Sequence, residues 1–131
     1  MFSCSRNETQ LIQDGIATSV TRQYPAGHPH KVGAQIIFTS SHVSHGDGEV
    51  PFAVGRIISI RPSSVAEMRR DERLCRMDGF RSCAEWFGHF KKRYPVFSDD
   101  TPVVRLQFKI EEMDKDVASK VSRPVEQTEI D

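Results

Sequence analysis

Hydroxyl groups and a guanidinium are concentrated in one short segment of the chain, GIATSVTRQY. Thr18, Ser19 and Thr21 precede Arg22, and the pattern is typical of a passage from a helix into a strand. Groups of this kind that emerge together at such a turn can hydrogen-bond a phosphate or a base edge. An edge strand with an ordinary surface arginine is an equally open interpretation. The candidate nucleic-acid contacts in this segment are Gly15, Thr18, Thr21 and Arg22.

A carboxylate occupies a second segment of interest, RMDGFRSCAEWF. Asp78 stands just before Gly79, a residue type that favours the end of a helix. A carboxyl group held at such a turn could serve as a general acid or base. Ser82 and Glu85 follow at the spacing of a reciprocal capping box, which predicts that a new helix begins there. The candidate catalytic residues are Asp78, Thr21 and Tyr24, and Asp78 is also a candidate ligand contact.

Other catalytic motifs find no support in the residue spacing. Neither G-x-S-x-G nor a phosphate-binding glycine loop occurs. His28-x-His30 and His42-x-x-His45-x-Asp47 have spacings that a metal could use, but both sets lie in loop sequence without a third ligand at helical spacing. The cysteines lack CxxC spacing. We therefore expect no metal and no cofactor.

The charge distribution is uneven although the net charge is zero. Between residues 56 and 93, ten Lys and Arg stand against five Asp and Glu; between residues 111 and 131, three stand against seven. A basic middle with an acidic tail is compatible with an anionic partner, although mixed-sign solvated surfaces are common. The basic residues expected to contact phosphate are Lys31, Arg56, Arg61, Arg69 and Arg76.

Length and composition predict one domain at residues 1–110 and an acidic, disordered tail at residues 111–131. No apolar run approaches the roughly 18 residues that a membrane helix needs. The first residues have no signal-peptide pattern. We expect a cytoplasmic protein without membrane association.

Hydrophobic periodicity predicts an α+β fold. A helix is expected at residues 7–14 with Asn7 or Thr9 as its cap, and residues 1–6 are expected to fray. Strands are expected at 17–24, 33–39, 52–61 (with a bulge near Gly55) and 103–110. Helical sequence fills 63–77, broken near Arg70, and a further helix follows from Ser82. Helices clustered in one insertion between strands favour a small β-barrel with helices packed at its edge.

The helix expected from Ser82 has a continuous apolar stripe. Its members are spaced at i, i+3, i+4, i+7 and i+11, which places them on one helical face and predicts a core contact. They are Cys83, Trp86, Phe87, Phe90 and Tyr94.

The chain resembles the ASCH domain, a family of the PUA-like barrel superfamily, from about Leu11 to Ile110. The glycine turn that leads to Arg22 is similar to the family's G-x-K-T-x-T-x-R turn. Lys31-Val32-Gly33 leads into the strand AQIIF, and the block RMDGFRSCAEWFGHFKKRYP and the closing strand VVRLQF complete the match. The resemblance implies a PUA-like barrel and an association with RNA.

The resemblance also implies two enzymatic branches, an amidohydrolase of N4-acetylcytidine that uses Lys, Thr and Glu, and a ribonuclease. Carried over by position, the lysine falls on Ala17, the threonine on Val20 and the acid on Asp78. Thr21 is adjacent to Val20, but neighbouring residues of a strand point to opposite faces. Two of the three catalytic groups are therefore missing.

These observations favour a non-catalytic domain that binds RNA or a nucleotide over an enzyme. The cleft would lie between the segment 15–22 and the Asp78 turn. Arg22 and Asp78 would face each other there, either as a polar floor for a base or as a structural ion pair.

Two alternatives remain open. One is a hydrolase that acts on RNA or a modified nucleoside, with Asp78 as general acid or base and Thr21 or Tyr24 assisting. The other is a protein-interaction module that contacts a partner through the acidic tail or through the loop HVSHGDGE.

Overall fold

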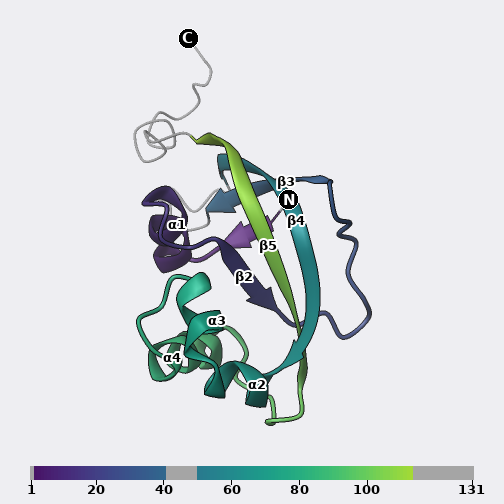
Figure 1. The fold of residues 1–131 in the computed structure, drawn as a ribbon, viewed down its shortest axis with the longest axis vertical. Helices are drawn as coiled ribbons and strands as arrows, with labels where there is room; N and C mark the ends of the chain where they lie inside the picture. Colours follow the sequence, from purple (N-terminus) through teal and green to yellow (C-terminus); the bar gives the residue numbers. More distant parts are fainter. Residues whose placement is uncertain (1, 41–49, 114–131) are drawn as a thin grey trace.

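The computed structural model describes residues 2–40 and 50–113. The described elements form one curled sheet with helices packed against its side and its lower end (Figure 1). The expected α+β class, a small barrel-like sheet with helices at its edge, is confirmed. In chain order the elements are β1 Phe2–Cys4, α1 Arg6–Gln13, β2 Ser19–Arg22, β3 Gln35–Ser40, β4 Val50–Ser64, α2 Val65–Arg70, α3 Glu72–Met77, α4 Cys83–Arg93 and β5 Pro102–Met113.

The strand order of the sheet is β1-β3-β4-β5-β2. β1 pairs with β3 in parallel, and the other neighbouring strands pair antiparallel. The long strands β4 and β5 curve together along the molecule (Figure 1). The register between them shifts at Val54/Gly55 and again at Ile57/Ser59, and such bulges bend a strand. The bulge expected near Gly55 is confirmed.

β2 is the edge strand that faces the helices. It pairs with β5 on one side. Toward the other side, the backbone N–H of Thr18 donates to the carbonyl of Met77 at 2.8 Å. The end of α3 is thereby held beside the start of β2, although the two segments are 59 residues apart.

Two hydrophobic clusters fill the structure, and Leu11 packs against both of them. The first lies between the sheet and α1. Its members include Phe2, Ile12, Val20, Ile36, Phe38, Phe52, Ile57, Leu106 and Phe108. The second lies among α2, α3 and α4 and contains Val65, Met68, Leu74, Cys75, Phe80, Trp86, Phe90 and Val103. The apolar stripe expected on the last helix is confirmed, because its other members, Cys83, Phe87 and Tyr94, pack against this cluster.

The N-terminal expectation was wrong. Residues 2–4 form strand β1 rather than a frayed end, because Phe2 and Cys4 are buried in the first cluster. The first helix begins at Arg6, and its cap is Ser5 rather than Asn7 or Thr9. The Ser5 hydroxyl accepts from the N–H of Glu8 at 3.2 Å, and the Glu8 carboxylate accepts from the N–H of Ser5 at 3.0 Å.

The cap of α4 differs in part from the expectation. The Ser82 hydroxyl accepts from the N–H of Glu85 at 3.1 Å, as expected. The Glu85 carboxylate, however, accepts from the N–H of Arg81 at 2.8 Å, so the box is not reciprocal. The break expected near Arg70 is present, since Asp71 ends α2 and caps α3.

The last strand continues to Met113, three residues beyond the expected end at Ile110. The rest of the acidic tail lies outside the described residues, so the division into domain and tail stays a prediction. Within the described ranges, every helix is too short or too polar to cross a membrane.

The turn at Gly79 generates a stability prediction. Its φ of +99° lies in the left-handed region, and a Cβ there would stand 2.9 Å from Cδ1 of Leu11. We expect Gly79→Ala to lower the free energy of unfolding by about 2 kcal/mol or more, measured by urea denaturation.

Gly88→Ala is the matched control for this change. Gly88 lies within helix α4, and an added Cβ would meet nothing within 4 Å. The control should gain about 0.5–1 kcal/mol of stability. Equal stability of the two variants would contradict the account of the turn.

Candidate functional site

The candidate site is built around the carboxylate of Asp78, at the turn that ends α3. The N–H of Gly79 donates to the Arg76 carbonyl at 2.9 Å, and that of Phe80 to the Cys75 carbonyl at 3.0 Å. This closed turn directs the Asp78 side chain inward, where the residue is only 5% exposed. A buried carboxylate needs hydrogen-bond donors, because each unsatisfied acceptor is costly.

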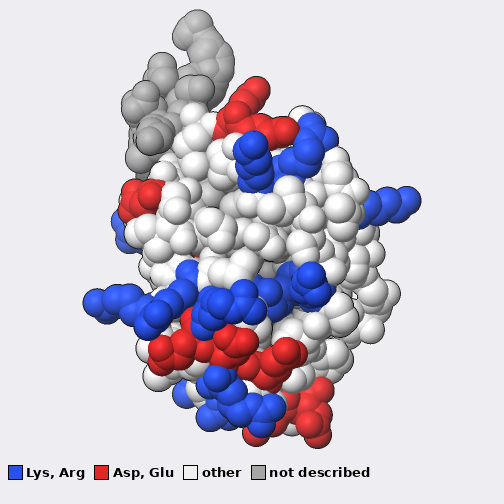
Figure 2. Space-filling view, viewed as in Figure 1, with Lys and Arg blue, Asp and Glu red and all other residues white. Residues whose placement is uncertain are grey.

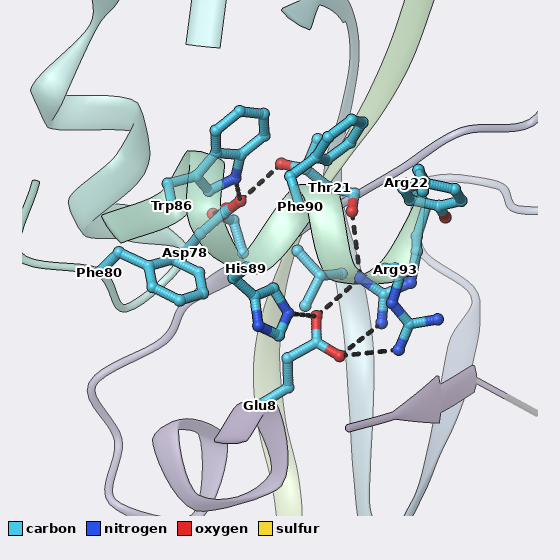
Figure 3. Close-up of a pocket in the computed structure, with 12 residues that line it drawn as sticks. Glu8, Thr21, Arg22, Asp78, Phe80, Trp86, His89, Phe90 and Arg93 are labelled. Carbon is cyan, nitrogen blue, oxygen red and sulfur yellow. Dashed lines mark hydrogen bonds and ion pairs between the residues drawn. The ribbon is translucent and has the colours of Figure 1, made fainter. Parts of the chain in front are cut away.

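Two strand hydroxyls and an indole supply those donors. Ser19 donates through Oγ to Oδ1 of Asp78, and Thr21 donates through Oγ1 to Oδ2 at 2.6 Å. Trp86 donates from Nε1 to the same Oδ2 at 3.1 Å (Figure 3). Val20, between the two hydroxyl residues, packs in the first hydrophobic cluster. The position carried over from the family resemblance, Val20, therefore points away from Asp78, and its neighbours carry the hydroxyls.

Arg105 of β5 brings a guanidinium to the same carboxylate. Its Nη2 donates to Oγ of Ser19 at 3.1 Å and lies 3.9 Å from Oδ1 of Asp78. Burial raises the pKa of Asp78 above its usual value. The hydrogen bonds from Ser19 and Thr21 and the charge of Arg105 offset only part of that rise.

A second buried carboxylate, Glu8 in the first turn of α1, lies in the same region. Arg22 binds it in a bidentate manner, with Nη1–Oε2 at 2.7 Å and Nη2–Oε1 at 2.9 Å. Arg93 donates from Nη2 to Oε1 at 3.1 Å, and Nε2 of His89 lies 3.6 Å from Oε2 (Figure 3). The expected pair of Arg22 with Asp78 was wrong, because Glu8 is the partner of Arg22.

The cluster sets the charge state of Glu8. Burial alone would raise the pKa of this carboxyl group. The contacts with His89 and Arg22 and the positive charge of Arg22 hold the pKa far below its usual value instead. Glu8 is therefore ionised at neutral pH and is surrounded by more positive than negative charge.

Both carboxylates line one small cavity, together with Arg22, as the sequence had suggested for Arg22 and Asp78. The cavity measures about 10 Å³, which is room for about one water molecule. Trp86 and Phe90 also line it, with their rings stacked at a centroid distance of 4.9 Å. In this closed form the cavity cannot hold a base.

A larger groove adjoins the cavity. Phe80, His89 and Arg93 line both spaces and so form the wall between them. The groove has a volume of about 730 Å³, within the range of small-molecule sites. Its remaining lining residues come from the start of α1 and from one face of α4: Ser5, Arg6, Asn7, Glu85, Gly88 and Lys92.

The other residues expected at the site lie outside the cavity lining. Gly15 ends the α1 turn with a φ of +73°, and Thr18 is exposed beside Met77. Tyr24 was expected to assist Asp78, but its hydroxyl contacts Nε2 of His30 at 2.8 Å. Tyr24 is not among the residues that line the cavity, so the structure does not bring it together with Asp78.

The basic residues expected to contact phosphate do not surround the cavity. Three of them are paired at the surface: Arg56 with Glu111 at 2.7 Å, Arg69 with Asp99 at 2.9 Å and Arg76 with Glu72 at 3.3 Å. Lys31 is exposed, and Arg61 lines a different groove. The cations of the groove that adjoins the cavity are instead Arg6, Lys92 and Arg93, none of which was a candidate from the sequence.

No group of three or more His, Cys, Asp or Glu within residues 2–40 and 50–113 could hold a metal ion. His28 and His30 stack on each other at a centroid distance of 5.7 Å. His42, His45 and Asp47 lie outside the described residues.

Comparisons with solved structures identify the fold. An ASCH domain from Lactobacillus crispatus matches with a TM-score of 0.56 and 18% identity, covering 83% of this chain and 79% of that one. An ASCH protein from Zymomonas mobilis matches with a TM-score of 0.60 and 12% identity, covering 94% of this chain and 77% of that one. A protein from Enterococcus faecalis, described by the family model DUF984, matches with a TM-score of 0.61 and 16% identity, covering 83% of this chain and 72% of that one.

No family model matches the sequence, and no curated protein is significantly similar to it. At these identities the structural matches establish the fold, which is the PUA-like barrel of ASCH domain structures. The fold expected from the sequence resemblance is confirmed.

The Glu8 cluster generates a prediction about pH. The folded state binds the Glu8 proton more weakly than the unfolded chain, whose carboxyl titrates near 4.5. Its contribution to stability is therefore present above that pH and is lost as the pH falls below it. We expect Glu8→Gln to lower the free energy of unfolding by about 3 kcal/mol at neutral pH, because it leaves buried guanidiniums unpaired.

The difference between wild type and Glu8→Gln should narrow as the pH falls below about 4.5, in urea titrations at a series of pH values. Glu85→Gln serves as the control, since Glu85 pairs with Arg81 at the surface, where such pairs contribute little. A gap that stays constant with pH would refute the assigned charge state.

Proposed function

We propose that this chain is an RNA- or nucleotide-binding domain, and that its ligand lies in the groove beside the Asp78 cavity. One observation carries the proposal. A groove with room for a nucleoside is lined by three cations against one carboxylate, and it shares three lining residues with a buried polar cavity. The cations are Arg6, Lys92 and Arg93, and the carboxylate is Glu85.

The charges of the groove suit an anionic ligand. The Glu85 carboxylate is already engaged by Arg81. Arg6 and Lys92 are exposed where they line the groove. Their charged groups can bind phosphate oxygens.

The wall of the groove suits a base. The His89 ring packs on Phe80 at a centroid distance of 5.1 Å. Bases of single-stranded RNA commonly stack on aromatic rings, and polar groups behind the ring then read their edges. If His89 and Phe80 turn aside, a base edge can reach the Asp78 carboxylate and the hydroxyls bonded to it.

The proposal favours binding over catalysis. Ala17, where the resemblance places a catalytic lysine, is 5% exposed and packs in the hydrophobic core. The cation near Asp78 is the guanidinium of Arg105, which stays protonated and cannot act as a base. The function therefore rests on recognition of the ligand.

Binding is tested by fluorescence anisotropy with labelled single-stranded and structured RNA over a salt series. Affinity should fall as salt rises, because phosphate contacts release counterions. Lys92→Gln should weaken binding about threefold to tenfold, since Lys92 lines the groove.

Lys91→Gln is the matched control for that variant. Lys91 is the neighbouring residue and is equally exposed, but its ammonium lies over the Phe87 ring, outside the groove. Equal loss in both variants, or no RNA binding at low salt, would refute the proposed site.

The Asp78 contacts favour hydrolysis as a second candidate function. A carboxylate with a raised pKa that is bonded directly to the Thr21 hydroxyl is an arrangement of general base and nucleophile. Arg105 would stabilise developing negative charge. The substrate class would be RNA or an acylated nucleoside such as N4-acetylcytidine.

Hydrolysis is tested by incubating the protein with N4-acetylcytidine and with RNA and following the products by chromatography. If the second function holds, turnover is expected in the wild type and should fall at least a hundredfold in Asp78→Asn and in Thr21→Val. Turnover that survives both changes would rule out this assignment.

A further inference from the structure

Arg105 also lines a second groove, between the strands β4 and β5 and the helices α2 and α3. This groove has a volume of about 460 Å³. Three arginines line it: Arg61 from β4, Arg73 from α3 and Arg105 from β5. On the face shown in Figure 2, a band of basic side chains crosses the middle of the molecule, and acidic side chains lie directly below it.

Two of these arginines oppose each other in the sheet. Arg61 and Arg105 are register partners in the antiparallel pair of β4 and β5. Residues directly opposite each other in such a pair project from the same face, and like charges there are destabilising. An anion between the two guanidiniums would remove that repulsion.

Arg105 is also poorly compensated within the described part of the chain. Its side chain is only 7% exposed, and its Nε has no hydrogen-bond partner there. The Asp78 oxygen nearest to it, 3.9 Å away, already accepts the hydrogen bond of Ser19. A buried guanidinium normally has close anionic partners, because its desolvation is costly.

The two carboxylates of the groove accept hydrogen bonds from other residues that line it. Glu67 accepts from the Ser63 hydroxyl at 2.7 Å, and Asp71 accepts from the N–H of Leu74 at 3.2 Å as the cap of α3. Across residues 2–40 and 50–113, neither Arg61 nor Arg73 forms an ion pair. Three guanidiniums therefore stand against two carboxylates in this groove, which leaves it with a surplus of positive charge.

We infer that this groove binds a phosphate group, held by Arg61, Arg73 and Arg105. Guanidiniums bind phosphate oxygens in a bidentate manner, which suits a groove that three arginines line. A phosphodiester of bound RNA is the source that we assign, and this assignment rests on the proposed function. Free phosphate is the other source of the same chemistry.

Inorganic phosphate tests the groove itself. In a titration followed by amide ¹H–¹⁵N spectra, the amides of Arg61, Arg73 and Gln107 should shift in the wild type. Arg61→Gln and Arg73→Gln should each weaken phosphate binding about tenfold, because each removes a charge-assisted contact. Both residues are exposed, so these variants should keep the fold.

Arg70→Gln is the matched control. Arg70 is exposed on α2 and does not line the groove. No phosphate binding by the wild type, or the same loss in Arg70→Gln as in the other two variants, would overturn the groove assignment.

RNA binding by the same variants separates the two sources. A tenfold loss in Arg61→Gln and Arg73→Gln supports an RNA phosphodiester in the groove. RNA binding unchanged in both variants overturns that source and leaves the proposed function standing. Phosphate binding by a wild type that binds no RNA supports the groove and refutes the proposed function.

Discussion

The structure depends on the hydrogen bonds that the buried Asp78 carboxylate accepts. This group ends α3, and its donors come from β2 and α4 through Ser19, Thr21 and Trp86. Arg105 connects β5 to the same point. A buried carboxylate without these donors would be strongly unfavourable, so the helices and the sheet edge are held together by one polar contact set. The same contact set fixes the geometry of the candidate site.

The two buried carboxylates have different surroundings, and this difference gives the site its character. Asp78 is bonded mainly to neutral donors, and burial raises its pKa. Glu8 is bonded to the guanidiniums of Arg22 and Arg93, and its pKa is held far below the usual range. One cavity is therefore lined by two different groups. Asp78 is a carboxylate suited to proton exchange or base-edge contacts, and the Glu8 cluster has surplus positive charge. Grooves lined by arginines flank it, one beyond His89 and Arg93 and one beyond Arg105.

Local sequence patterns predicted several of the residues in this arrangement but not which of them contact one another. The turn before Gly79 brought out Asp78 as a candidate, and the cluster of hydroxyls and a guanidinium in residues 15–22 brought out Thr21 and Arg22. Glu8 was missed although Ser5-x-x-Glu8 has the same capping spacing as Ser82-x-x-Glu85, because the opening residues were expected to fray. Its partners are 14 and 85 residues away, and no local pattern encodes such contacts. Arg105 was not a candidate, because it alternates with the apolar residues Val104 and Leu106 as a residue of a solvated strand face would; in the structure its side chain is buried and contacts Met77 of α3.

The central claim is that a ligand reaches the Asp78 cavity from the groove beside it. Trp86 is the only tryptophan of the chain, and its indole N–H is bonded to Asp78, so its fluorescence reports on that contact directly. Saturation with single-stranded RNA should shift the Trp86 emission and change its accessibility to a neutral quencher such as acrylamide. An RNA complex with unchanged emission and unchanged quenching would place the ligand elsewhere and contradict the account.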